Sequence, residues 1–430
     1  MTQQETRAAQ CAIEAIWHLE AAKVIGRVAR IVRNIGLAED FAQDALVAAL
    51  ESWPKDGVPD NPGAWLMTVA KRRALDFLRH QGLADGMATE LGVEIDLQHQ
   101  IASEELAMQV DDRLDDHIGD DLLRLIFTAC HPVLSPEARC ALTLRVMGGL
   151  TTDEIARAYL KPEPTIAQRI VRAKKTLSAS KVPFEIPRGA ELAERLCSVL
   201  EVIYLIFNEG YAATSGKDWM RPALCEEALR LGRVLAGLMP DASEVLGLVA
   251  LMEIQASRFA ARVSPDGEPV LLMDQDRTQW DQLLIRRGLD ALAQAESLPD
   301  ALGPYRLQAA IAACHARALS GDETDWARIA ALYDALAQLM PSPVVVLNQA
   351  VAIAMAFGPA AGLEIVDTLL DEPSLRDYHL LPAVRGDLLA RLSRYEEARV
   401  EFQRAAGLAR NERERALLSA RAAAVGDEQS

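Results

Sequence analysis

Residues 150–177 read LTTDEIARAYLKPEPTIAQRIVRAKKTL, which is the pattern of a short helix, a tight turn and a basic second helix. Thr151 and Glu154 stand at the spacing of a capping box, and this predicts where the first helix begins. The second helix has an apolar stripe at helical spacing, formed by Ile166, Ile170, Ala173 and Leu177. Because this stripe predicts a buried face, the remaining side chains must project elsewhere. The whole pattern is typical of a helix-turn-helix and indicates DNA binding.

The polar side chains of this second helix are the candidate contacts with duplex DNA. Arginine can recognise guanine with two hydrogen bonds, lysine neutralises phosphates, and side chains near the helix start reach base edges. The candidates are Thr165, Gln168, Arg169, Arg172, Lys174 and Lys175. The net charge of −17 argues against a nucleic-acid partner, but residues 157–188 are locally basic. The alternative is a basic helix face that is only solvated.

Length and composition limit the fold class. The chain has 430 residues, half of them hydrophobic and only 5% aromatic, with many Ala and Leu and few β-branched runs. This balance predicts an all-α protein of about two to four domains. No apolar run reaches the length of a membrane span and no signal peptide opens the chain, so we expect a cytoplasmic protein without a membrane partner. The six cysteines are expected to be reduced core residues, with no metal site.

The chain divides into blocks when its apolar periodicity is followed. Three helices are expected in the first block: one that stops at Gly36, one from about Glu39 to before Pro54, and one from about Gly63 to His80. An acidic stretch rich in glycine follows and predicts a flexible linker. Ser135 and Pro136 begin a further helix before the helix-turn-helix.

The last block, from about Arg188 onward, shows signs of a repeat. The similar segments 235–240 (LAGLMP) and 336–341 (LAQLMP) lie 101 residues apart, close to three periods of the tetratricopeptide unit. Gly386, Ala398 and Phe402 stand at small and large packing positions of such a unit. A helical-repeat domain is expected, and a non-repetitive α-bundle remains the alternative.

No catalytic pattern is present. The histidines are scattered, and neither a G-x-S-x-G nucleophile motif nor a phosphate-binding P-loop occurs. We therefore expect no enzyme, no catalytic residues and no cofactors.

Three stretches, read in order, resemble the sigma-70 superfamily, and in particular the extracytoplasmic-function sigma factors. Residues 38–46 (AEDFAQDAL) resemble sigma region 2.2, residues 64–79 (AWLMTVAKRRALDFLR) resemble regions 2.3 and 2.4, and residues 150–177 resemble region 4.2. Residues 204–211 (YLIFNEGY) and 274–280 (DQDRTQW) resemble the long extension of one subgroup. One departure from the family is Arg72, which stands where the family commonly has Asn in the part that would meet the −10 element.

The resemblance implies an arrangement of domains: sigma-2 at residues 1–82, an acidic linker at 83–117, sigma-4 at 118–182 and a tetratricopeptide-like extension at 188–430. It also implies a function, namely that the chain binds core RNA polymerase and directs initiation at promoter DNA. The extension would regulate this activity through an intramolecular contact with the sigma domains. A free-standing helix-turn-helix regulator with a helical-repeat sensor domain is the alternative.

The resemblance also assigns site residues in three groups. The helix-turn-helix residues would read the −35 element. Polymerase binding is carried over to Asp40, Gln43 and Asp44. Contacts with the −10 element are carried over to Asn61, Trp65, Arg72, Arg73, Asp76 and Arg79. For Trp65 a place in the core is the favoured interpretation.

Overall fold

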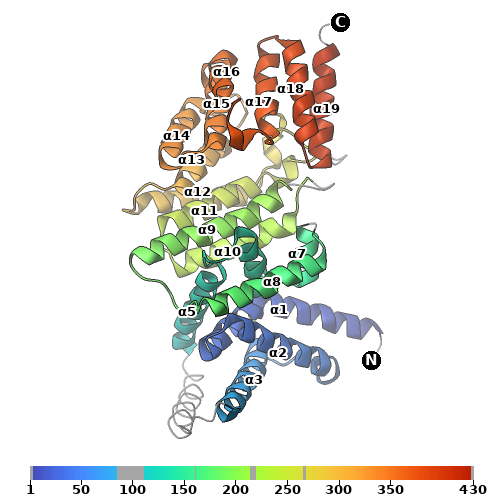
Figure 1. Cartoon of the computed structure of the whole chain (residues 1–430), viewed down its shortest axis with the longest axis vertical. Helices are drawn as coiled ribbons and strands as arrows, with labels where there is room; N and C mark the ends of the chain where they lie inside the picture. The colour runs from blue at the N-terminus through green and yellow to red at the C-terminus, as the bar shows by residue number, and fades with distance from the viewer. Residues whose placement is uncertain (1–2, 85–110, 160, 214–218, 265–267, 428–430) are drawn as a thin grey trace. The chain divides into compact units, whose positions relative to one another are not determined.

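A computed structural model describes residues 3–84, 111–159, 161–213, 219–264 and 268–427 of the chain. They form two compact units, which divide between Ile203 and Tyr204 (Figure 1). Helices account for nearly all regular structure in these residues, and a single β-bridge joins Val263 and Pro269. The all-α prediction is confirmed. None of the described helices is long and apolar enough to cross a membrane.

In the first unit α2, α3 and α5 pack on α1, whereas α6, α7 and α8 pack on one another; Figure 1 shows these helices in blue to green. The last helix, α9, begins in this unit and continues past its boundary. The apolar faces of the helices close a core in which Trp17, Val28, Ala42, Leu66 and Leu125 are buried. The helices are α1 (Gln3–Val32), α2 (Ile35–Asp56), α3 (Pro62–Ala84), α5 (Asp111–Ala129), α6 (Pro136–Val146), α7 (Thr152–Ala158), α8 (Glu163–Ala179) and α9 (Ala190–Tyr211).

The junction between α1 and α2 differs from the prediction, in which the first helix stopped at Gly36. The first helix ends at Val32, and Arg33 takes a left-handed conformation with φ of 51°. The Asn34 side chain then accepts hydrogen bonds from the N–H groups of Gly36 and Leu37 and so caps α2. Asparagine is a strong N-cap residue, and here this local signal outweighed the apolar periodicity across the junction.

The ends of α2 and α3 also differ from the prediction by a few residues. The α2 helix continues through Pro54 to Asp56, and Gly57, with φ of 90°, donates its N–H to the carbonyl of Trp53. The α3 helix begins after Asn61, whose side chain accepts the N–H of Ala64 at 3.0 Å. Proline falls in the last turn of α2, where few intrahelical bonds remain to be broken.

The helix signals around residues 135–154 are confirmed. Ser135 caps α6 by accepting the N–H of Ala138, and Gly149 takes the left-handed conformation (φ 67°) after that helix. The carboxylate of Glu154 accepts the N–H of Thr151 at 2.7 Å, while the Thr151 hydroxyl accepts the N–H of Glu154 at 3.1 Å. This reciprocal pair is the predicted capping box, and it starts α7 where the sequence placed it.

Most of the predicted acidic linker, residues 85–110, lies outside the described residues. Its last part, residues 111–117, is not a linker but the beginning of α5. The first half of α9 belongs with the first unit as well: Arg195 donates to the carbonyl of Phe127 at 2.7 Å, and Ser198 donates to the carbonyl of Cys130 at 2.6 Å. The first compact unit therefore reaches Ile203 rather than ending near residue 182.

The second unit is a succession of helices that pack on nearby helices of the chain, either the next one or, as with α11 and α13, the next but one. A repeat domain would have such local packing. The helices of the second unit, yellow-green to red in Figure 1, are α10 (Pro222–Leu238), α11 (Ser243–Ala256), α12 (Gln282–Ser297), α13 (Pro304–Arg317), α14 (Trp326–Leu339), α15 (Pro343–Phe357), α16 (Pro359–Thr368), α17 (Leu380–Arg391), α18 (Tyr395–Leu408) and α19 (Glu412–Asp427). The packing positions expected for a repeat are buried: a Cβ added at Gly386 would lie 3.1 Å from the ring of Phe402. Glycine at this position lets α17 approach α18 closely.

The two segments that resemble a subgroup extension hold the second unit together. Glu209 forms a half-buried ion pair with Arg221, and the guanidinium of Arg262 lies over the ring of Tyr211 at 3.5 Å. Arg277 donates to the carbonyls of His315 and Ala318 at 2.7 and 2.8 Å. Both segments therefore form contacts within the second unit that stabilise its fold.

Candidate nucleic-acid and polymerase interface

Helix α8 presents the candidate −35 residues on the faces that its apolar stripe leaves free. Ile166, Ile170, Ala173 and Leu177 are all buried, as predicted. Opposite them, Thr165, Gln168, Arg172 and Lys175 are exposed, and Arg169 is half-buried. A helix with one face anchored and a polar face open to solvent can enter a major groove without losing its own packing.

Arg169 lies close to an acidic residue at the start of α6, Glu137. The pKa of Glu137 lies below its ordinary value, because a backbone N–H and the Ser135 hydroxyl donate to it, with a smaller contribution from the positive charge of Arg169. Arg169 therefore has a carboxylate of its own unit nearby, while Arg172 is exposed on the next turn. Arg172 is the more exposed of the two arginines.

Lys174 does not share the open face of its neighbours. Its ammonium group forms an ion pair with Glu39 and a second with Asp40 at 3.2 Å, both on α2, and only 17% of its side chain is exposed. The other candidate −35 residues are therefore available to solvent, whereas Lys174 is bound by two carboxylates of α2. Sequence reasoning placed Lys174 with these other residues, because helical spacing alone does not show which faces meet another helix.

The candidate polymerase residues lie on α2, and two of them take part in ion pairs. Asp40 has 66% of its side chain exposed although it contacts Lys174. Asp44 pairs with Arg73 of α3 at 2.9 Å. Gln43, which precedes Asp44 in the sequence, is half-buried. The carboxylates remain on the surface, where a basic partner surface could compete for them.

The candidate −10 residues on α3 divide into surface and packing positions. Arg72 is exposed, and Asp76 and Arg79 pair with each other at 3.2 Å on the surface. Trp65 is half-buried, and its ring lies edge-on to the ring of Trp53, with the ring centroids 5.3 Å apart. This contact agrees with a packing role for Trp65. Asn61, although exposed, serves as the cap of α3.

Two buried acids in this unit were not recognised from the sequence. Glu39 accepts the Nε of Arg145 at 2.8 Å in addition to its pair with Lys174. Asp121 on α5 receives Arg124 at 2.9 Å and Arg27 at 3.5 Å. A signal for Glu39 was present: it occupies the same helix face as Ile35 and Ala42, and an acid in an apolar stripe needs a buried partner.

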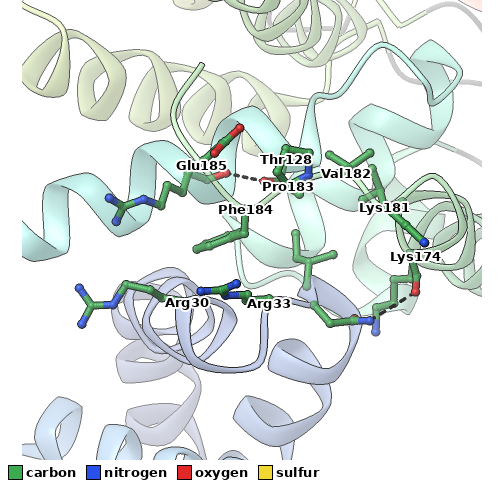
Figure 2. A pocket seen from close by; sticks show the side chains of 14 residues that line it. Arg30, Arg33, Thr128, Lys174, Lys181, Val182, Pro183, Phe184 and Glu185 are labelled. Carbon is green, nitrogen blue, oxygen red and sulfur yellow. Dashed lines mark hydrogen bonds between the residues drawn. The ribbon is translucent and has the colours of Figure 1, made fainter. Parts of the chain in front are cut away.

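A cavity of about 680 Å³ lies between the end of α1, α5 and the end of α8. Figure 2 shows Arg30 and Arg33 on one side, the 182–183 segment on the other, and the Phe184 ring between them. Most charged residues of its lining are basic, and Glu185 is the acidic one: the bases are Arg30, Arg33, Arg124, Lys174 and Lys181. The lining is therefore predominantly basic.

Among the cysteines whose side chains the structure describes, all but one are buried. Burial raises the pKa of Cys130 to about 11 and that of Cys225 to about 12, and Cys140 and Cys314 are buried as well. Cys197 is exposed, so the expectation that every cysteine is a core residue is wrong at this position. Within the described residues, no group of histidine, cysteine and carboxylate side chains could hold a metal ion.

Comparison with known proteins agrees with this geometry. Residues 18–83 match sigma-70 region 2, residues 124–177 match sigma-70 region 4, and residues 195–296 match a family of unknown function, DUF6596. An uncharacterized protein of Rhizobium meliloti is 42% identical over 92% of both chains. No solved structure matches the chain significantly.

Other relatives are named as sigma factors. The ECF RNA polymerase sigma factor SigK of Mycobacterium ulcerans is 31% identical over 34% of this chain and 74% of its own length. SigK of Mycobacterium sp. strain KMS is 28% identical over 37% of this chain and 77% of its own length. Sigma factors are initiation factors and not enzymes. With regions 2 and 4 in order on the first unit, the chain belongs to the extracytoplasmic-function sigma factors of the sigma-70 family.

Proposed function

We propose that this sigma factor directs core RNA polymerase to specific promoters by a division of labour among three helices. Helix α8 reads the −35 element, α3 contacts the −10 element and the exposed acids of α2 bind polymerase. The observation that carries the proposal is the open polar face of α8, with Thr165, Gln168, Arg172 and Lys175 exposed opposite a fully buried stripe. The match to region 2 removes the free-standing regulator, which needs no polymerase-binding domain.

The sharpest test of this proposal is transcription from a pool of templates. The purified protein is added to core polymerase with fragmented genomic DNA of its source, and the transcripts are sequenced. We expect start sites that share upstream elements and depend on the added protein. A transcript set identical to that of core polymerase alone would contradict the proposal.

The polymerase-binding face is tested by charge reversal on α2. Changing Asp40 and Asp44 to lysine should reduce recovery of core polymerase in a pull-down, because a basic or polar partner surface loses two carboxylates. The matched control reverses Glu51 and Asp56, which are exposed near the other end of the same helix. Equal recovery by the two double variants would show that Asp40 and Asp44 do not form the docking surface.

The second unit is proposed to regulate the sigma domains and to be required for activity. A helical-repeat unit of this size exceeds what two DNA-binding domains need for stability, and its surface suits a protein contact. A cut after Pro187 would remove Arg195 and Ser198, which hold the core of the first unit, so the informative truncation ends at Ile203. We expect this truncation to lose transcription while still binding −35 DNA. A truncated chain that transcribes like the full chain would contradict the regulatory role.

A further inference from the structure

The basic cavity at the ends of α1 and α8 takes no part in the proposed function. Its volume of about 680 Å³ lies within the range of pockets that hold small molecules. The chain as a whole has a net charge of −17, so a concentration of bases is a local exception. A cavity lined mainly by cations attracts an anion. Its lining bases are Arg30, Arg33, Arg124, Lys174 and Lys181.

Three of these bases are held in place by buried acids that do not themselves line the cavity. Lys174 forms an ion pair with the buried Glu39. Asp121, also buried, receives Arg124 at 2.9 Å and lies 3.8 Å from Arg30. Bases fixed in this way lose little freedom when an anion binds, which is a property of preorganised sites.

The other two bases, Arg33 and Lys181, differ from these three in their partners and in their backbone. Within the described residues, neither side chain takes part in an ion pair. Both residues have a left-handed backbone, with φ of 51° and 49°, and Ser393 is the only other described non-glycine residue with a positive φ. Glycine fits this conformation better than a residue with a Cβ. Strained residues of this kind cluster at ligand-binding sites, and these two line the same cavity.

An aromatic side chain lies among the bases. Figure 2 shows the Phe184 ring between Arg33 on one side and the 182–183 segment on the other. Phe184 is half-buried, so part of its surface is accessible. Arginine and lysine pair with phosphate groups, and a nucleobase stacks on an aromatic ring. Cations and a ring in one cavity therefore fit a nucleotide better than they fit an inorganic anion.

We infer that this cavity binds a nucleoside di- or triphosphate, with its phosphates on Arg33 and Lys181 and its base against Phe184. The inference goes beyond the proposed function and does not depend on it. Residues 181–185 lead from α8 to α9, and the cavity lining includes all five of them. A bound nucleotide should therefore protect this connection from hydrogen exchange.

The test measures binding of ATP, GTP and pyrophosphate to the full chain by isothermal titration calorimetry. We expect at least one of the two nucleotides to bind with a Kd below about 0.1 mM. Pyrophosphate should bind about tenfold more weakly, because it lacks a base to stack on the ring. The bound nucleotide should also slow hydrogen exchange in peptides covering 180–189. No binding of any of the three probes at millimolar concentration would overturn the inference.

The cations are tested by replacing Arg33 and Lys181 together with glycine. Glycine adopts the left-handed conformation easily, so this double variant should fold about as stably as the parent, measured by thermal unfolding. It should bind the nucleotide about a hundredfold more weakly, because two charge-assisted contacts are lost. The matched control combines Ser393→Gly, the same backbone change in the second unit, with Lys55→Ala, which removes an exposed cation outside the cavity. Equal affinity of the two double variants would show that the nucleotide binds elsewhere.

The ring is tested separately, with a change that leaves the cations in place. Phe184→Leu should weaken nucleotide binding about tenfold and leave pyrophosphate binding unchanged. An equal loss for both probes, or no loss for either, would contradict the stacking of a base on this ring.

Duplex DNA is the competing occupant, because its phosphates also pair with arginine and lysine. If the parent binds no nucleotide and the double glycine variant loses affinity for duplex DNA, the cavity belongs to DNA and the inference is wrong. Nucleotide binding is measured without polymerase. A parent that binds nucleotide but does not support transcription would therefore count against the proposed function alone.

Discussion

Replacing Arg277 by Ala should destabilise the second unit, because this side chain joins segments that are distant in the chain. Its guanidinium donates to the carbonyls of His315 and Ala318 and, at 3.0 Å, to the hydroxyl of Thr324. It also lies over the ring of the buried Trp280, with its Cζ 5.0 Å from the ring centroid. The carbonyls belong to the end of α13, where a cation is favourable.

The size of the effect follows from these contacts. Three hydrogen bonds contribute about 1 kcal/mol each after exchange with water, and the contact with the Trp280 ring adds about 0.5–1 kcal/mol. We therefore expect Arg277→Ala to lower the free energy of unfolding by about 3–4 kcal/mol, a large part of a typical domain's stability. Arg277→Lys keeps the charge but not the planar fork of donors, and it should recover about half of this loss.

The assay is hydrogen exchange of the full chain, followed by mass spectrometry, together with urea unfolding. Peptides covering 313–326 should lose protection in Arg277→Ala, partly regain it in Arg277→Lys, and remain unchanged in Arg287→Ala, which alters an exposed arginine of α12. The contribution of Arg277 is refuted if Arg277→Ala and Arg287→Ala show the same protection and the same unfolding midpoint.

Three further predictions concern other elements. Changing Arg169 and Arg172 together to Ala should keep helicity but weaken promoter binding by about 1–3 kcal/mol for each arginine that contacts a guanine, measured by DNA titration, and unchanged transcription would show that α8 does not read the promoter. Glu154→Ala removes half of the α7 capping box and should cost about 1 kcal/mol in urea unfolding, with an unchanged midpoint as the contrary result. Burial and the charges of two nearby arginines lower the pKa of His315 from 6.5 to about 4. The unfolded chain therefore takes up a proton first, and stability should fall by about 3 kcal/mol between pH 6.5 and pH 4, a dependence that His315→Gln should remove.

The sequence predicted helix starts and buried helix faces correctly wherever the residues involved contact near neighbours in the chain. The Ser135 cap, the Thr151–Glu154 capping box and the buried stripe of α8 all depend on contacts within one or two turns. Such contacts are set by spacing along the chain, so a single sequence is enough to predict them. The helix junction near Gly36 is also decided locally, because the Asn34 side chain caps α2 across an apolar pattern that continues through the junction.

The candidate site was only partly predictable, because its residues belong to different helices. The sequence indicated that Thr165, Arg172 and Lys175 would leave the apolar stripe, and they are exposed. It could not show that Lys174, one residue from Lys175, would face α2, since that depends on how two helices pack. Trp65 shows the same limit, because the residue it packs against, Trp53, belongs to another helix.

By itself, the sequence determined the helical class, the helix-turn-helix and the membership in the sigma-70 family, since periodicity, caps and motif order are properties of the linear chain. The tertiary structure alone decided which charges meet. It buried Glu39 between Arg145 and Lys174, and it placed Arg277 against the end of α13, 38 residues further along the chain. The physical reason is that a buried ion pair forms only where folding brings two opposite charges together away from water. The spacing of residues along the sequence does not show which charges will meet in this way.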